Sequence, residues 1–253
     1  MAIDISHLVV IGCSFAYCQG LESPKTQGWP ARVAAQLGVP VVNLSGKGAG
    51  NDKIMRRLFE YHYLNIKHGN NPFYIISYSH SSRREEYIEK REDYCIIDMH
   101  PDAIGKPSDE FSKPCLINYN QEVMSRKKLM IQAYILNFLK SNKLNYLTTD
   151  YLPDHDMDIE LYVKSLFPEA YQEVYFDQYR MKNFNEFSKM YTPLPCGHDD
   201  LEAQAEITNY TFPKLLELYS EPNVVNKPYA TLADYSNYYK LNGILEGIEL
   251  DWF

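Results

Sequence analysis

The segment Ser6-His7-Leu8-Val9-Val10-Ile11-Gly12-Cys13-Ser14 sets the architecture of this chain. Its apolar centre is rich in β-branched residues and closes at Gly12. Short apolar runs that end at glycine are typical of parallel strands covered on both faces. We therefore predict a buried strand over residues 6–12, with Ser14 in the turn that follows it.

Two further runs repeat this pattern. Residues 40–44 and 73–78 are rich in Val, Ile and aromatic residues, and we predict strands there. The segments between the strands, residues 29–37 and a stretch that begins at Asn51 or Asp52, have helical spacing of apolar residues. Strands that alternate with helices favour right-handed crossovers. The predicted fold is a three-layer α/β/α sandwich with a central parallel sheet, of the flavodoxin-like kind.

The second half of the chain continues the alternation after an interruption. Residues 80–118 are charged and proline-containing, so we expect a loop-rich insertion over the sheet. The expected elements that follow are a helix over about 121–139, a strand near 144–149, a short helix around 157–166, and a helix over 199–218 that Pro213 kinks or splits. The predicted domain spans residues 1–220, and residues 221–253 form a Tyr- and Asn-rich C-terminal extension packed on it.

Composition excludes several classes of protein. The chain has 253 residues, a net charge of −8 and no polybasic run, so we expect no nucleic-acid partner. No apolar run is long enough to cross a bilayer, and the N-terminus has no basic segment before an apolar core, so we expect neither a membrane span nor a secretory signal. The 5 cysteines are an odd number without a CxxC pair, which favours reduced thiols and a cytoplasmic location.

Candidate chemistry lies where the predicted strands end. Ligands of an open parallel sheet bind beyond the carboxyl ends of its strands, a position held here by residues 12–15, 46–51 and 77–84. Ser14 would need a base and oxyanion donors to act as a nucleophile. The glycine-rich turn after the second strand lets main-chain N–H groups approach a substrate oxygen, and His198 supplies a candidate base. Cys196 and His198 have no second pair of metal ligands, so we expect no metal.

The order of these elements resembles the SGNH/GDSL hydrolase family. The matching blocks are Gly12-Cys13-Ser14-Phe15 followed by Gly20-Leu21, then Asn43-Leu44-Ser45-Gly46-Lys47-Gly48, and last Pro195-Cys196-Gly197-His198. The stretches 11–21, 28–30, 42–54 and 79–85 are most similar to divergent SGNH-like proteins of tailed bacteriophages. The resemblance covers about residues 6–85 and 196–220.

This resemblance implies a serine-dependent ester hydrolase of the EC 3.1 class without a cofactor. Ser14 is then the nucleophile and His198 the general base. The N–H groups of Ser14 and Gly48 line the oxyanion hole, and its third donor is Ser79 or Asn51, or is absent. The implied substrate is a small-molecule or carbohydrate O-acyl ester. Arg83 and Arg84 would bind a carboxylate or phosphate of that substrate; solvated arginines on a loop are the alternative.

The sequence departs from the family pattern at three places. Cys13 stands where the first block has Asp, and Ser79-His80 stands where the third strand has Asn-Asp. Pro195 replaces the Asp that orients the histidine, so a main-chain carbonyl, Asp199 or Asp200 would have to take its role. These departures leave alternatives open: a catalytically degenerate ligand-binding or interaction protein of the same fold, acyl transfer to an acceptor other than water, and a homo-oligomer formed through the tail.

Overall fold

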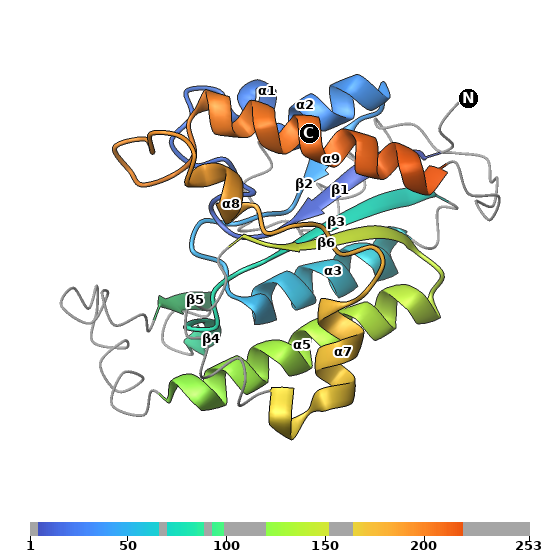
Figure 1. Cartoon of the computed structure of the whole chain (residues 1–253), viewed down its shortest axis with the longest axis vertical. Helices are drawn as coiled ribbons and strands as arrows, with labels where there is room; N and C mark the ends of the chain where they lie inside the picture. The colour runs from blue at the N-terminus through green and yellow to red at the C-terminus, as the bar shows by residue number, and fades with distance from the viewer. Residues whose placement is uncertain (1–4, 66–69, 89–92, 99–119, 152–163, 220–253) are drawn as a thin grey trace.

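The structure, a computed structural model, describes residues 5–65, 70–88, 93–98, 120–151 and 164–219 (Figure 1). Its centre is a parallel sheet of 4 strands in the order β2-β1-β3-β6. The strands are β1 (His7–Ile11), β2 (Val41–Asn43), β3 (Pro72–Tyr78) and β6 (Asn145–Asp150). Helices cover both faces of this sheet in Figure 1, so the predicted three-layer α/β/α sandwich is confirmed.

The register of β1 and β3 explains the glycine that follows β1. Ile11, the last residue of β1, pairs with Ile76, so β3 continues past β1 through Ser77 and Tyr78. A Cβ at Gly12 would lie 2.9 Å from the Cβ of Ser77. Only glycine avoids this clash, so Gly12 allows the chain after β1 to turn directly against β3.

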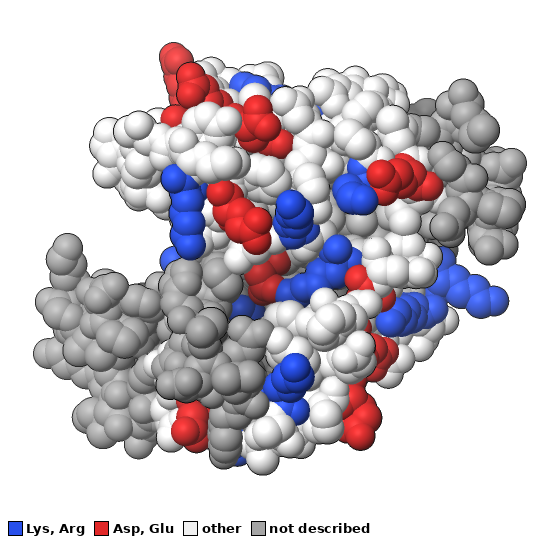
Figure 2. Space-filling model, viewed as in Figure 1, with Lys and Arg blue, Asp and Glu red and all other residues white. Residues whose placement is uncertain are grey.

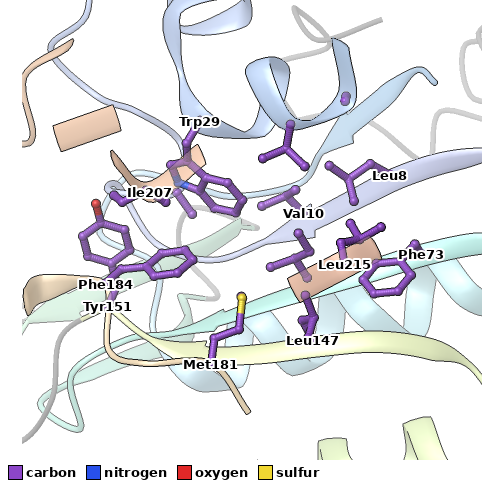
Figure 3. Close-up of a cluster of buried hydrophobic side chains, with 14 of the residues drawn as sticks. Leu8, Val10, Trp29, Phe73, Leu147, Tyr151, Met181, Phe184, Ile207 and Leu215 are labelled. Atoms are coloured by element: carbon purple, nitrogen blue, oxygen red, sulfur yellow. The ribbon is translucent and has the colours of Figure 1, made fainter. Parts of the chain in front are cut away.

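One face of the sheet is covered by α1 (Pro24–Gln27), α2 (Trp29–Leu37) and α9 (Leu201–Tyr219). Leu8 and Val10 of β1 point to this face and are fully buried, as is Trp29 at the start of α2. Figure 3 shows the indole of Trp29 among side chains from β1, β6, α9 and the segment before α8 (Asn185–Ser188). The Trp29 ring meets that of Phe184 edge-on at 5.3 Å between centroids, so the start of α2 is firmly held.

The other face is covered by α3 (Asn51–Asn65), α5 (Gln121–Ser141) and α7 (Pro168–Tyr175). Val9 and Ile11 point to this side, because successive strand residues face opposite ways. Ile54 and Leu58 of α3 are buried against them, as the predicted helical stripe requires. The side chain of Asn120 caps α5 by accepting a hydrogen bond from the N–H of Val123 at 3.1 Å.

The insertion, which we expected to be loop-rich, begins with an antiparallel hairpin. Its strands are β4 (Arg83–Ile88) and β5 (Asp93–Asp98). The Arg-Arg-Glu-Glu start of β4 has no alternating apolar pattern, so the sequence did not indicate a strand there. Arg56 of α3 binds the carboxylate of Glu85 with two hydrogen bonds, of 2.7 and 2.8 Å. This buried carboxylate fixes the hairpin to α3, while residues 99–119 of the insertion lie outside the described ranges.

The elements predicted after the insertion were confirmed in part. The helix over about 121–139 and the strand near 144–149 are confirmed by α5 and β6. The short helix expected around 157–166 falls mainly outside the described residues, and only residues 164–166 are seen to be helical. Helix α7 was not predicted. Pro213 does not split α9, because the carbonyl left without its usual partner belongs to Asn209, which is exposed to solvent.

Two findings concern the surface and the ends. No helix among the described residues combines the length and apolar character that a membrane span needs. On the face drawn in Figure 2, basic and acidic side chains are interspersed and no broad area carries a single sign of charge. The extension over residues 221–253 lies outside the described ranges.

Candidate active site

Ser14 lies in a tight helical turn directly after β1. The turn is closed by main-chain hydrogen bonds from Gln19 N–H to the Ser14 carbonyl and from Cys18 N–H to the Phe15 carbonyl, both 3.0 Å. These two bonds make a Schellman motif, in which Cys18 is the left-handed residue with φ of +63°. Ser14 is 3% exposed, and its own N–H makes no hydrogen bond within the described part of the chain.

A second turn, after β2, lies beside the first. The N–H of Gly46 donates to the carbonyl of Gly12 at 3.0 Å. The side chain of Asn43 accepts from the N–H of Ser45 at 3.0 Å and donates to the carbonyl of Ala16 at 2.9 Å. Asn43 therefore joins the turn that carries Ser14 to the glycine-rich turn, a role that its place at the end of a strand did not reveal.

Gly48 occupies the tip of the glycine-rich turn. Its φ of +69° lies in the left-handed region that favours glycine. Its N–H, like that of Ser14, makes no hydrogen bond in the ranges that the structure describes. The two predicted main-chain oxyanion donors are thus both uncommitted.

Arg57 of α3 contacts the glycine-rich turn through its guanidinium group. Its guanidinium donates to the carbonyl of Leu44, and a Cβ at Gly46 would lie 3.2 Å from its Nη1. Burial lowers the pKa of Arg57, and no described carboxylate lies within ion-pair distance of it. We did not predict a role for Arg57 from the sequence, although a basic residue on the buried stripe of α3 indicates a role in the structure.

Asn51 and Ser79 meet where α3 begins and β3 ends. Oδ1 of Asn51 accepts from the N–H of Ser79 at 2.9 Å, and Nδ2 donates to the Ser79 carbonyl at 3.0 Å. The main-chain N–H of Ser79 is therefore occupied. The Ser79 hydroxyl is buried and makes no hydrogen bond in the described part, so it and the second Nδ2 hydrogen of Asn51 are the candidates for a third oxyanion donor.

His198 precedes α9 and reaches back to the first turn. Its ring centroid lies 4.6 Å from that of Phe15, the residue after Ser14. Its Nδ1 lies 3.1 Å from the carbonyl oxygen of Cys196. A carbonyl can only accept, so Nδ1 carries the proton and Nε2 keeps its lone pair. Of the groups considered for orienting His198, this main-chain carbonyl is the one bonded to it.

The two aspartates after His198 have other roles. Oδ1 of Asp200 accepts from the N–H groups of Glu202 and Ala203, at 3.0 and 2.9 Å, and so caps α9. Asp199 is buried, and its Oδ2 lies 3.5 Å from Nε2 of Gln204. Burial, together with the neighbouring charge of Asp200, raises the pKa of Asp199 to about 7.

The electrostatics of the site favour a neutral imidazole. Burial is the largest cause that lowers the pKa of His198, and the positive charge of Arg83 lowers it further. The hydrogen bond to Cys196 acts in the opposite direction. The net pKa is below the ordinary value of 6.5, so the ring is unprotonated at neutral pH and able to accept a proton.

Arg83 and Arg84 open β4 above the glycine-rich turn. A Cβ at Gly50 would lie 2.4 Å from the Arg83 carbonyl oxygen and 2.9 Å from the Arg84 Cα, so the hairpin passes directly over Gly50. The positive charge of Arg83 acts on the imidazole by lowering the pKa of His198. The described structure thus brings the glycine-rich turn, the start of β4 and the His198 segment to one edge of the sheet. It shows no group of three metal-ligating side chains in its described ranges.

Comparison with known proteins identifies the fold. No family model and no curated protein matches the chain. Among solved structures, the chain is similar to the psychrotrophic esterase EstA from Pseudoalteromonas sp. inhibited by monoethylphosphonate, with 12% identity, 85% of this chain and 100% of that chain covered, and a TM-score of 0.54. It is also similar to TesA, with 17% identity, coverage of 84% and 99%, and a TM-score of 0.50. A lower TM-score of 0.44 relates it to a structure described as a G-D-S-L family lipolytic protein from Desulfitobacterium hafniense, with 14% identity and coverage of 83% and 99%. The chain therefore shares the α/β fold of EstA and TesA.

Proposed function

We propose that this protein is an SGNH-type serine ester hydrolase, with Ser14 as nucleophile and His198 as general base. One observation carries the proposal. The imidazole of His198 contacts Phe15, next to Ser14, while the Cys196 carbonyl holds its Nδ1. Because Nδ1 carries the proton in that hydrogen bond, Nε2 would be the atom that accepts a proton from Ser14. Similarity in fold to an esterase inhibited by a phosphonate supports it.

The chemistry follows from these roles. Ser14 Oγ attacks the ester carbonyl carbon while its proton passes to Nε2 of His198, and the carbonyl oxygen takes the negative charge. The intermediate collapses when the C–O bond to the alcohol breaks and the alcohol takes the proton from His198. A water molecule then attacks the acyl-serine and gives a proton to His198. When the C–Oγ bond breaks, Ser14 Oγ takes that proton from His198 and the carboxylic acid is released.

The oxyanion of this intermediate needs donors that are already in place. We assign this role to the N–H groups of Ser14 and Gly48, which make no other hydrogen bond in the described part. The Ser79 hydroxyl or the second Nδ2 hydrogen of Asn51 would be the third donor. In known enzymes the loss of one such donor costs about 2.7–4 kcal/mol of transition-state stabilisation.

The finer identity of the substrate rests on the sequence resemblance. It suggests a carbohydrate O-acyl ester, and Arg83 and Arg84 would bind an acidic group of such a substrate. The kinship with tailed-bacteriophage proteins, the cytoplasmic location, the lack of nucleic-acid, membrane or cofactor partners, a homo-oligomeric state and the packing of the C-terminal extension stay predictions.

Reaction with a fluorophosphonate probe tests the proposal. We expect the wild-type protein to be labelled once, on Ser14, as seen by mass spectrometry of its peptides. Ser14→Ala should abolish labelling, and His198→Ala should slow it by a factor of 100 or more, on the order of what general-base catalysis contributes. Ser77→Ala is the matched control, because Ser77 is also buried at this edge and its hydroxyl has no hydrogen bond in the described part.

Labelling together with turnover of p-nitrophenyl acetate separates the hydrolase from a ligand-binding protein and from an acyl transferase. A folded wild-type protein that is neither labelled nor active on p-nitrophenyl acetate would overturn the hydrolase proposal and leave a ligand-binding protein of this fold. Formation of a new ester when a short alcohol is added would show that the acyl group is transferred to an acceptor other than water.

A further inference from the structure

Cys18 ends the turn that carries Ser14 in a conformation that side chains rarely adopt. Its φ of +63° puts it at the left-handed position of the Schellman motif, where glycine is the usual residue. A Cβ is unfavourable in this region, so the backbone alone would prefer glycine. The side chain of Cys18 must therefore make a contact that glycine cannot provide.

The thiol of Cys18 makes that contact with α9. Cys18 is 1% exposed, and its Sγ lies 3.2 Å from Oε1 of Gln204. Gly28 leaves the room for it, since a Cβ at position 28 would lie 2.6 Å from this sulfur. Burial raises the pKa of the thiol, so Cys18 keeps its proton and acts as a hydrogen-bond donor rather than as a nucleophile.

Gln204 connects this thiol to the histidine side of the site. Its Oε1 also accepts from the N–H of Trp29 at 2.9 Å, which ties α9 to the start of α2. Its Nε2 lies 3.5 Å from Oδ2 of Asp199, the residue after His198. Gln204 is 1% exposed, so a single buried amide touches the end of the Ser14 turn, the start of α2 and the segment that carries His198.

We propose that Cys18 and Gln204 are a pair of positioning residues that fix the Ser14 turn relative to His198. The inference rests on the proposed function, since it assigns these residues a role in aligning that same site. In this proposal neither side chain contacts the substrate. Displacement of a reacting group by about 1 Å can cost a factor of 100 in rate, so a buried link between the two segments is a direct means of holding the geometry.

Replacement of Cys18 tests the pair without relying on a destabilised variant. Cys18→Gly removes the thiol and relieves the left-handed strain, while the lost core packing of Cys18 opposes that gain, so the midpoint of thermal unfolding should change little. Fluorophosphonate labelling of Ser14 should nevertheless slow by about a factor of 10 or more, with kcat for p-nitrophenyl acetate reduced and KM unchanged. Cys18→Ser keeps a donor and should restore most of the rate. A purely structural role would link the rate to stability and would not give this separation.

Gln204→Met tests the partner. It keeps the length of the side chain and removes the acceptor, and we expect the same loss of kcat at unchanged KM. The double variant should be no slower than the slower single variant, because both remove one link. Thr211→Val is the control on α9, since its buried hydroxyl makes no hydrogen bond in the described part and the rate should stay at the wild-type value.

The outcomes distinguish this inference from the function on which it rests. Wild-type labelling on Ser14 together with unchanged rates in Cys18→Gly and Gln204→Met would overturn the positioning pair alone. An additive loss in the double variant would likewise show that the two residues act separately. A folded wild-type protein without labelling or turnover would overturn both proposals.

Discussion

Asn51 and Ser79 exchange two hydrogen bonds, so the first residue of α3 is locked to the segment that follows β3. Both residues are buried, at 3% and 0% exposure, and water cannot replace either bond. The pair therefore fixes the glycine-rich turn, which leads into Asn51, against the neighbouring strand end. Its loss should weaken the fold and the site together.

Asn51→Ala should lower the free energy of unfolding by about 2–3 kcal/mol, because it leaves the N–H and carbonyl of Ser79 buried without partners. Urea unfolding followed by circular dichroism measures this change. Asn137→Ala, which removes an exposed Asn from α5, is the control and should change stability by no more than about 0.5 kcal/mol. Equal stability of the two variants would show that the Asn51 bonds contribute nothing net.

The rate of hydrolysis should follow the protonation of His198. The base must be neutral, so kcat/KM should rise with pH through the pKa of His198 and reach half its maximum below pH 6.5, since burial and Arg83 hold that pKa below its ordinary value. Arg83→Gln removes a positive charge that disfavours the imidazolium, so the pKa should increase and the acid limb should move to higher pH.

The pH profile of Lys140→Gln serves as the comparison, because Lys140 lies at the far end of α5 and pairs with Asp177. Its acid limb should coincide with that of the wild type. An acid limb of Arg83→Gln that moves to lower pH, or does not move, would contradict the effect of the Arg83 charge on the imidazole.

Asp199 should make stability depend on pH. Its folded pKa, raised to about 7 chiefly by burial, exceeds the ordinary 3.8 of the unfolded chain. The folded state therefore holds the proton more tightly, and this carboxyl costs stability progressively as pH rises from about 4 to 7, with no further cost above that range. Asp199→Asn removes the ionisation, so its advantage over the wild type should grow across this range to at most about 4 kcal/mol.

Unfolding midpoints at pH 5 and pH 8 measure this difference. Glu202→Gln, an exposed change in the same turn of α9, should run parallel to the wild type. If Asp199→Asn also ran parallel, Asp199 would titrate in the folded protein as it does in the unfolded chain.

Gly50 should be intolerant of a side chain for a reason specific to the hairpin. Gly50→Ala would place a Cβ 2.4 Å from the carbonyl oxygen of Arg83, and the hairpin would have to move. We expect a loss of about 1–3 kcal/mol from overpacking and a slower reaction with the phosphonate probe. Gly38→Ala meets no atom within 4 Å but has a φ of +70°, so it should cost about 1 kcal/mol and leave labelling unchanged. Equal labelling of both variants would argue against a role of the hairpin at the site.

The two central strands, β1 and β3, could be predicted from the sequence because they are largely apolar on both faces. All residues of β1 and β3 are buried, and such runs stand out in any reading of the chain. Strand β4 could not be predicted, because it has no apolar pattern and its Glu85 is held by ion pairs with Arg56 and Lys53. Helix α7 was missed because few of its side chains are buried.

The candidate site was likewise only partly predictable from the sequence. Ser14, Gly48 and His198 were found because they sit in recognisable short segments. The contacts of Gln204 could not be found, because its partners Trp29 and Cys18 lie 175 and 186 residues away in the chain. No local sequence pattern predicts these long-range contacts of Gln204, which form only when α9 packs on α2. The carbonyl that orients His198 was one of several open choices until the main-chain geometry was known.

The docking of α9 on α2 also bears on how the protein is made. When the chain has been translated through α8, the whole sheet and the Ser14 turn have been synthesised, whereas His198 and Gln204 have not. We therefore expect nascent and prematurely terminated chains to expose the α2 side of the sheet and to be incapable of turnover. Hydrolytic activity would appear only after α9 has emerged and packed on α2.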